Sequence, residues 1–120
     1  MYKVVFYKDK SNKSEITELL DKLYTQSKTN KNARINHDKM VAYMGLLEQY
    51  GTYIGEPVVK HIMDNIWELR PLKNRVFFFY WKDNKFVMLH HFIKKSNKTP
   101  QKEIDLAKAK LKDYIERYGK

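Results

Sequence analysis

Four short apolar runs between residues 58 and 93 constrain the fold of this chain more than any other feature. They cover residues 58–63, 65–70, 75–82 and 85–93, with turn residues at their junctions. Runs of this length, rich in aromatic and β-branched residues, are typical of strands. Because connections this short join antiparallel neighbours, the pattern predicts a meander of β-hairpins.

The first 26 residues predict one more strand and a helix. Side chains alternate in type over residues 2–8, as they do in a strand. Asn12 is placed to cap a helix, with Glu15 three residues later. Apolar residues at helical spacing then extend from Ile16 to Tyr24.

Two further helices are predicted, one on each side of the strand meander in the sequence. An apolar stripe runs from about residue 33 to residue 50, and Gly51 supplies the residue that ends the helix. Thr99 is expected to cap a final helix, with Pro100 at its first position and Glu103 in its first turn. The polar link at residues 27–32 makes the first two helices an antiparallel hairpin.

The predicted order is therefore β-α-α-β-β-β-β-α, which indicates an α+β fold in one domain spanning residues 1–120. The helical hairpin is expected to cover one face of the sheet. The other face remains for a ligand or for the last helix.

The charge of the chain indicates a polyanionic partner. Its formal net charge is +10 and its pI is near 9.7. A membrane surface is the other candidate, although no run approaches the roughly 20 apolar residues of a spanning helix. The N-terminal residues lack the apolar stretch of a signal peptide, so we expect a cytoplasmic protein. Since the chain has no cysteine, disulfide frameworks and thiolate metal sites are excluded, and we expect neither metal nor cofactor.

Most of the excess charge lies in the second half of the chain. Residues 60–120 hold fifteen Lys and Arg against seven Asp and Glu, which gives 15 − 7 = +8. The segment from residue 90 to residue 100 stands out, because it combines two histidines, three lysines and two hydroxyls with no carboxylate. Cations and hydroxyls at the end of a strand suit the binding of phosphate.

Two arginines reinforce this segment. Arg70 ends one predicted strand and Arg75 begins the next. They are candidates for a guanidinium pair on one phosphate, because the planar guanidinium matches phosphate oxygens in pairs. The alternative is that both are surface arginines paired with Glu68. Lys94, Lys95 and Lys98 are likewise either cations of the site or a solvated loop.

Histidine and aromatic residues are weaker candidates. His90 and His91 are neighbours on a predicted strand, so they face opposite ways. Strict alternation groups His90 with Met88, and His91 with Leu89. Each histidine is alternatively a satisfied core residue or an exposed one, and the spacing to the other two histidines does not favour zinc. Tyr80 is a candidate for stacking on a base, or else part of the core.

The motifs exclude several kinds of chemistry. The chain has no Gly-rich phosphate loop and no acidic cluster of the kind that binds two metal ions. RNA permits cleavage without metal, because its 2′-hydroxyl attacks the adjacent phosphorus. Such a reaction needs a base, an acid and cations for the developing charge, which imidazole, lysine, tyrosine and arginine can provide.

Several segments together resemble a known family. They are Trp67-Glu68-Leu69-Arg70, Arg75-Val76 with Tyr80, Leu89-His90, residues 92–100, and Glu103-Ile104 with Ala107. In combination they resemble the phage-derived HigB-like toxins of the RelE/ParE superfamily, which belong to type II toxin–antitoxin systems. The resemblance covers about residues 55–110, and the order of elements agrees along the whole chain.

The resemblance implies a RelE-like sheet, antiparallel or mixed, with an N-terminal helical hairpin on one face and a C-terminal helix. It implies a toxin that cleaves mRNA on the ribosome and is neutralised by a helix-turn-helix antitoxin of the HigA type. No membrane partner is expected.

Residue roles follow from the same resemblance. Arg70 and Arg75 match the arginines that bind the scissile phosphate, and Lys95 belongs to the basic strand-end motif. We group these three with His91 as catalytic candidates. The RNA-binding candidates are Lys60, Lys94, Lys98 and Tyr80.

The chain departs from the family pattern in two places. His91 stands where the family commonly has a small residue, usually glycine, and Ser96-Asn97 replaces the usual Thr-Gln. Two other functions stay open for the same fold. One is a ParE-like inhibitor of DNA gyrase, and the other is an RNA-binding protein without catalytic activity.

Overall fold

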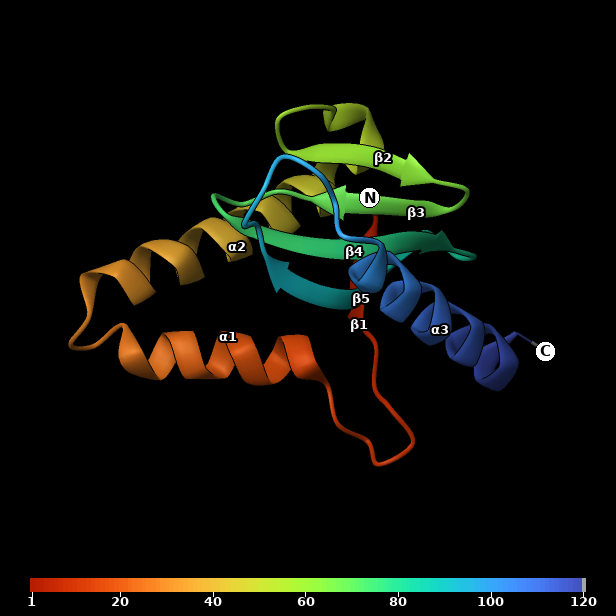
Figure 1. The fold of residues 1–120 in the computed structure, drawn as a ribbon, viewed down its shortest axis with the longest axis horizontal. Helices are drawn as coiled ribbons and strands as arrows, with labels where there is room; N and C mark the ends of the chain where they lie inside the picture. Colours follow the sequence, from red (N-terminus) through yellow and green to blue (C-terminus); the bar gives the residue numbers. More distant parts are fainter. Residues whose placement is uncertain (120) are drawn as a thin grey trace.

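A computed structural model describes residues 1–119 and shows a five-stranded sheet between two layers of helix (Figure 1). The elements are β1 (Lys3–Phe6), α1 (Glu15–Gln26), α2 (Lys31–Tyr50), the 3₁₀ helix η1 (Gly51–Ile54), β2 (Val59–Met63), β3 (Ile66–Leu69), β4 (Asn74–Trp81), β5 (Lys85–Ile93) and α3 (Gln101–Tyr118). In space the strands follow the order β1-β5-β4-β3-β2. β1 runs parallel to β5, and every other pair of neighbours is antiparallel.

The predicted α+β class and strand meander are confirmed. The four apolar runs form β2 to β5 in consecutive hairpins, and α1 and α2 form the expected helical hairpin on one face. Residues 82–84 form the turn between β4 and β5, and Asp83 and Asn84 in it have φ angles of 64° and 57°. Two consecutive left-handed residues match the right-handed twist of the flanking strands, and Asp and Asn tolerate this conformation.

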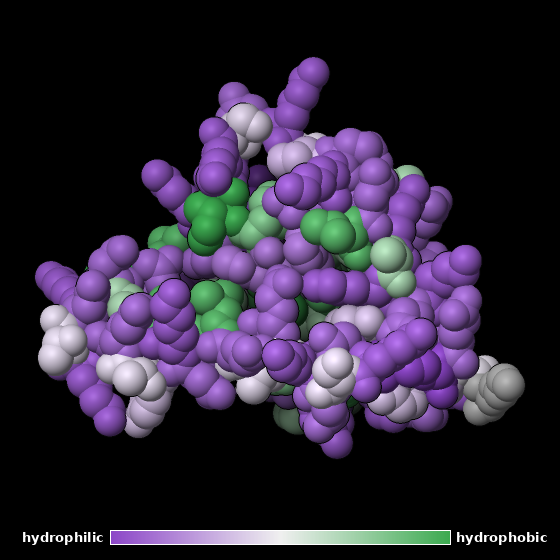
Figure 2. Space-filling model, turned by 60° about the horizontal axis from the view of Figure 1, so that its bottom comes forward, coloured by the Kyte–Doolittle hydropathy of each residue, from purple (hydrophilic) through white to green (hydrophobic). Residues whose placement is uncertain are grey.

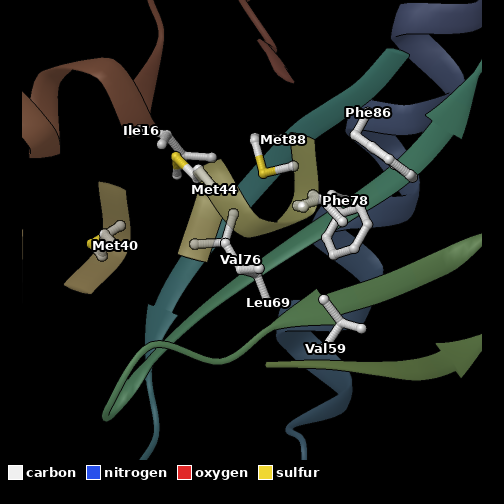
Figure 3. Packing of buried hydrophobic residues seen from close by; sticks show 10 residues of the cluster. Ile16, Met40, Met44, Val59, Leu69, Val76, Phe78, Phe86 and Met88 are labelled. Carbon is white, nitrogen blue, oxygen red and sulfur yellow. The ribbon is translucent and has the colours of Figure 1, made fainter. Parts of the chain in front are cut away.

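The face of the sheet that carries the helical hairpin is an apolar core (Figure 3). Side chains from both helices meet side chains from four strands, and burial of each contributes roughly 1.5–3 kcal/mol. The buried members are Ile16, Met40, Met44, Leu47, Val59, Leu69, Val76, Phe78, Phe86 and Met88.

Helix α3 packs on the opposite face, which therefore carries the last helix. Ile104 and Ala107 contact Phe77 and Phe92 near the start of the helix. Further along, Tyr114 packs with the apolar residues of β4 and β5. The chain crosses from the end of β5 to α3 through residues 94–100, and this loop lies over the strand ends (Figure 1).

β5 has one residue more than β4 in their paired stretch. Phe77 pairs with His90 and Phe78 pairs with Met88, so Leu89 is left without a partner. Such a β-bulge turns two consecutive side chains toward the same side. Leu89 packs against Tyr114 of α3, and His90 reaches Glu103 of α3. The predicted alternation, which placed His90 with Met88, is therefore wrong beyond Leu89.

Two helix starts also differ from the prediction. The side chain of Asp9 accepts the backbone N–H groups of Ser11 and Lys13, and Asn12 lies in this turn with φ 63°. The cap of α1 is consequently Ser14, whose Oγ accepts the N–H of Thr17, rather than Asn12.

At the other end of the chain, Pro100 precedes α3 in the capping position, so the helix starts one residue after the predicted Pro100. The predicted cap, Thr99, lies one residue further out.

The surface that Figure 2 shows is mostly hydrophilic, and its hydrophobic residues form separate groups. Among residues 1–119, no helix combines the length and the apolar character that crossing a bilayer requires.

Candidate nucleic-acid interface

A small cationic cleft of about 40 Å³ lies where the ends of β2, β3 and β4 meet the loop between β5 and α3. Six of its lining side chains are cations and one is a carboxylate. The lining residues are Lys60, Glu68, Arg70, Arg75, Phe92, Lys94, Lys95, Ser96, Asn97, Lys98, Thr99 and Pro100. Such a surface suits the oxygens of a nucleic-acid backbone.

Strand register places the charged residues on the face of the sheet that carries α3. Lys60 of β2 lies opposite Glu68 of β3, and Glu68 lies opposite Phe77 of β4. Arg75 lies opposite Phe92, whose ring lines the cleft. Since successive side chains of a strand alternate, Trp67 and Leu69 point to the helical hairpin while Glu68 points to the cleft.

Both guanidinium groups form ion pairs with Glu68. Its Oε1 lies 3.4 Å from Nε of Arg70 and 3.7 Å from Nε of Arg75. The second contact of Arg70 is an ion pair of 3.2 Å between its Nη1 and Oε1 of Glu56. Nη1 of Arg75 instead donates to the carbonyls of Leu72 and Asn74, at 2.8 Å each. In both arginines Nε and Nη1 face protein groups, so Nη2 is the nitrogen left for a ligand.

Burial sets the electrostatics of this group. Glu68 is 3% exposed and Arg75 is 6% exposed. Burial raises the pKa of the Glu68 carboxyl, and the charges of Arg75, Arg70 and Lys60 counteract part of that rise. Burial also lowers the pKa of the Arg75 guanidinium, while Glu68 opposes the shift. Nε of Arg70 is buried and has no hydrogen-bond partner in the described part of the chain.

The loop that follows β5 adds the remaining cations. Its first residue, Lys94, is anchored because its N–H donates to the carbonyl of Lys73 at 2.8 Å. Oγ of Ser96 donates to the carbonyl of Lys98 at 3.1 Å, which closes a small turn. Lys95 and Lys98 are exposed, as is Lys60 across the cleft. The ammonium groups therefore lie on the solvent side of buried Arg75 and half-buried Arg70.

Two predicted site residues lie elsewhere. His91 is opposite Val76 on the face of the helical hairpin, and its Nε2 lies 2.9 Å from Oδ1 of Asn74. Nδ2 of Asn74 donates to Asn36 of α2, so its Oδ1 faces His91 as an acceptor. Burial lowers the pKa of the His91 imidazole.

Tyr80 is on the same face as His91, at the opposite end of β4 from Arg75. Its hydroxyl donates to Asn84 at 3.2 Å, and its ring packs against Tyr2 and Phe86. The structure thus brings together six of the eight predicted residues, Arg70, Arg75, Lys95, Lys60, Lys94 and Lys98, and leaves out His91 and Tyr80.

His90 faces α3 but belongs to a separate network. Its Nε2 lies 2.8 Å from Glu103, and its Nδ1 lies 3.2 Å from Nζ of Lys110. Glu15 at the start of α1 joins the same group through Lys110 at 3.3 Å. These contacts tie α1, β5 and α3 together beyond the end of β1, which explains the burial of His90 in structural terms.

Glu68 is the cleft residue that the sequence reasoning used only as a possible partner of surface arginines. The signal was present, since Glu68 and Arg70 share a strand face in Trp67-Glu68-Leu69-Arg70. Within residues 1–119 there is no group of three His, Cys, Asp or Glu side chains that is arranged to hold a metal ion.

Comparison with known proteins places the chain in a family. Residues 27–112 match the model of the phage-derived protein Gp49-like family. The chain belongs to the Gp49-like family. Gp49-like proteins are toxin-like members of toxin–antitoxin systems, and the matched stretch includes every residue that lines the cleft. No curated protein matches the chain.

Proposed function

We propose that this Gp49-like protein is a HigB-like toxin that cleaves mRNA on the ribosome. The observation that carries the proposal is the cleft, which surrounds two fixed guanidinium groups with four lysines at one end of the sheet. Guanidinium and ammonium groups stabilise the charge that develops on phosphorus, and such preorganised groups are usually the largest contribution to catalysis.

The proposed reaction is transesterification of RNA. The 2′-hydroxyl gives its proton to water, the 2′-oxygen attacks the adjacent phosphorus, and the bond from phosphorus to the 5′-oxygen breaks. The leaving oxygen takes up a proton, so the products are a 2′,3′-cyclic phosphate and a 5′-hydroxyl. The step needs no oxidant and no metal.

Each cleft residue has a role in this proposal. Arg70 and Arg75 bind the scissile phosphate through the guanidinium edges that face the cleft. Lys95 is exposed at the rim, where an ammonium group is placed to protonate the leaving oxygen. Lys60, Lys94 and Lys98 bind the phosphates on either side. His91 and Tyr80 are outside the cleft and take no part.

The ribosome and the antitoxin enter the proposal through the resemblance to HigB-like toxins. The antitoxin is a helix-turn-helix protein of the HigA type with an acidic or amphipathic segment, because such a segment complements the cationic cleft. The site of action is the cytoplasm, where ribosomes and mRNA are found.

Expression of the protein in bacteria, with mapping of mRNA 5′ ends, tests the proposal. We expect growth arrest together with new 5′ ends inside coding regions, and both effects disappear in an Arg75 variant. Growth arrest with intact transcripts and a DNA-damage response would instead establish the ParE-like inhibition of gyrase. RNA binding without arrest would establish a non-catalytic protein.

A further inference from the structure

The buried carboxylate of Glu68 is the only acidic group among the described residues that line the cationic cleft. A carboxylate among six cations weakens the attraction of the cleft for phosphate, because it cancels charge at the position where phosphate would bind. A residue that served only to attract RNA would not be acidic. Its presence therefore requires another reason.

The geometry supplies that reason. One oxygen atom, Oε1 of Glu68, faces Nε of Arg70 at 3.4 Å and Nε of Arg75 at 3.7 Å. Without an anion between them, two guanidinium groups this close repel each other, and each one has several rotamers available. The shared carboxylate draws both Nε edges inward, so the opposite edges of the two groups face the same ligand.

The burial of Glu68 indicates whether this residue positions the arginines or transfers a proton. The Glu68 side chain is 4% exposed, and its Oε1 lies within ion-pair distance of both guanidinium groups. A general base has to come within hydrogen-bond reach of the proton that it removes. A carboxylate that is almost fully buried and is paired with both arginines suits their positioning better than removal of the 2′-hydroxyl proton of RNA.

We propose that Glu68 is the positioning residue of this site and fixes Arg70 and Arg75 as one preorganised pair for phosphate. This inference rests on the proposed function for its substrate, but the fixed arrangement is a property of the free protein. Loss of the carboxylate lowers the rate of the chemical step, because misplaced charge-stabilising groups cost roughly tenfold to a hundredfold in rate. It does not weaken RNA binding, because a negative charge has been removed.

Glu68→Gln is the test variant, and Glu56→Gln is its matched control. Glu56 is an ion-pair partner of the same Arg70 at 3.2 Å, but its side chain is 66% exposed. Both substitutions remove one negative charge next to Arg70, and only Glu68→Gln removes the buried charge that Arg75 shares. Exposed pairs contribute little, so we expect Glu56→Gln to change the cleavage rate by less than about twofold.

The experiment has two readouts on wild type and on each variant. Single-turnover cleavage of mRNA on ribosomes is compared with the affinity for a short RNA oligonucleotide. NMR of the arginine side chains follows the Nε–H signals of Arg70 and Arg75 in the free protein. We expect Glu68→Gln to slow cleavage at undiminished RNA affinity, and to shift both Nε–H signals and speed their exchange with water. Glu56→Gln should leave the Arg75 signal unchanged.

Each contrary result has a defined meaning. Wild-type cleavage together with wild-type arginine signals in Glu68→Gln overturns the inference. Slow cleavage with unchanged arginine signals also overturns it, because Glu68 would then act on the substrate. If Glu68→Gln does not fold, Glu68→Asp, which withdraws the carboxylate by one methylene, is judged on the same two readouts. Absence of cleavage by the wild type refutes the proposed function, whereas the arginine signals still decide the role of Glu68.

Discussion

The two faces of the sheet, although built from the same strands, differ in the kind of side chain that they bury. The face under α1 and α2 is sealed by apolar side chains, with Met40, Leu47 and Met88 fully buried (Figure 3). The face under α3 is apolar beneath the helix, and it buries Glu68 near the end of β3 and Arg75 near the start of β4. Burial of apolar side chains under α1 and α2 stabilises the fold by itself. Burial of charged side chains on the face of α3 is tolerated only because each charge has a partner of opposite sign.

This difference indicates where the fold can accept a functional site. The helical hairpin covers the strand ends on its own face. On the other face, α3 begins only after residues 94–100 have crossed the sheet, so a stretch of that face stays open to solvent. We infer that residues of the first face determine stability, and that those of the open stretch determine activity.

Arg75→Ala should have the largest effect and most directly tests the functional side of this comparison. We expect a loss of transition-state stabilisation of about 3–4 kcal/mol, because a preorganised donor to the reacting phosphate disappears. Measured cleavage of mRNA on ribosomes should fall by roughly 10²–10³-fold. Arg34→Ala, an exposed arginine of α2, is the control with the same change of charge.

Urea unfolding of Arg75→Ala accompanies that measurement, because removal of one member of a buried ion pair is itself destabilising. A folded Arg75→Ala protein that cleaves at the wild-type rate would exclude this residue from the mechanism.

Met88→Ala tests the structural side. Met88 is fully buried against the helical hairpin, so we expect the free energy of unfolding to fall by about 3 kcal/mol through lost burial and a residual cavity. Urea unfolding measures the loss, and cleavage per folded molecule should be unchanged. Val41→Ala, at an exposed position of α2, is the control and should change stability by less than about 0.5 kcal/mol. A specific loss of activity in folded Met88→Ala would show that the two faces are coupled.

Gly51→Ala tests the junction between α2 and η1 on the same structural side. Gly51 has φ 64°, and a Cβ at this position would lie 2.7 Å from the ring of Tyr2. We expect a loss of about 2 kcal/mol in the free energy of unfolding from the left-handed conformation and the displaced ring. Thermal unfolding measures it, with Gly45→Ala as control, because a Cβ at Gly45 meets nothing within 4 Å. Equal stability of the two variants would refute this reading of Gly51.

His91→Gln tests whether a histidine on the face of the helical hairpin makes stability depend on pH. Burial lowers the pKa of the His91 imidazole below its ordinary 6.5, so the unfolded chain binds this proton more readily than the folded protein. The contribution of neutral His91 is therefore present above pH 6.5 and is lost as the pH falls through the lowered pKa. We expect His91→Gln to cost about 1 kcal/mol at neutral pH, through the altered contact with Asn74, and to flatten the fall in stability between about pH 7 and pH 5.

Urea unfolding at a series of pH values compares His91→Gln with the wild type. A proportional loss of cleavage activity in His91→Gln, at full stability, would return this histidine to the list of catalytic residues.

Lys98→Ala should have the smallest effect, because Lys98 is a single exposed cation that binds a flanking phosphate in the proposal. Removal of one phosphate contact lowers the slope of log affinity against log salt by about 0.7 for a single strand. Titration of an RNA oligonucleotide at several salt concentrations measures that slope, with the exposed Lys112→Ala of α3 as control. Equal slopes for the two variants would show that RNA binds outside the cleft.

The sequence predicted the strands and their hairpins well, because alternation and turn residues are local signals. The short turns at residues 71–74 and 83–84 determined which strands are neighbours. It could not predict the parallel partner of β1, since that pairing joins Lys3 to Lys85 across the whole chain. Ser14 was missed as a cap because Asn12 offers the same chemistry two residues earlier, and only the turn around Asp9 distinguishes them.

Membership of the cleft could be predicted from the sequence for residues at strand ends, and less well for the other residues. Arg70 and Arg75 lie on either side of one short turn, so any hairpin brings them close. The faces of His90 and His91 depended on the pairing between β4 and β5, which alternation within one strand does not reveal. The burial of Glu68 likewise depends on Lys60, Phe77 and the loop that crosses above them.

Leu89 divides β5 into two segments. The alternation of side chains between the two faces of the sheet shifts by one residue at this position. Before it, even-numbered residues such as Phe86 and Met88 face the helical hairpin; after it, the odd-numbered His91 does so. Deletion of Leu89 would therefore shorten β5 by one residue without turning any other side chain to the opposite face. Met88 and His90 would become ordinary alternating neighbours, and His91 would still face the helical hairpin. Leu89 is thus an apolar side chain added on the side of α3, where it packs against Tyr114, to a strand whose two faces are otherwise regular.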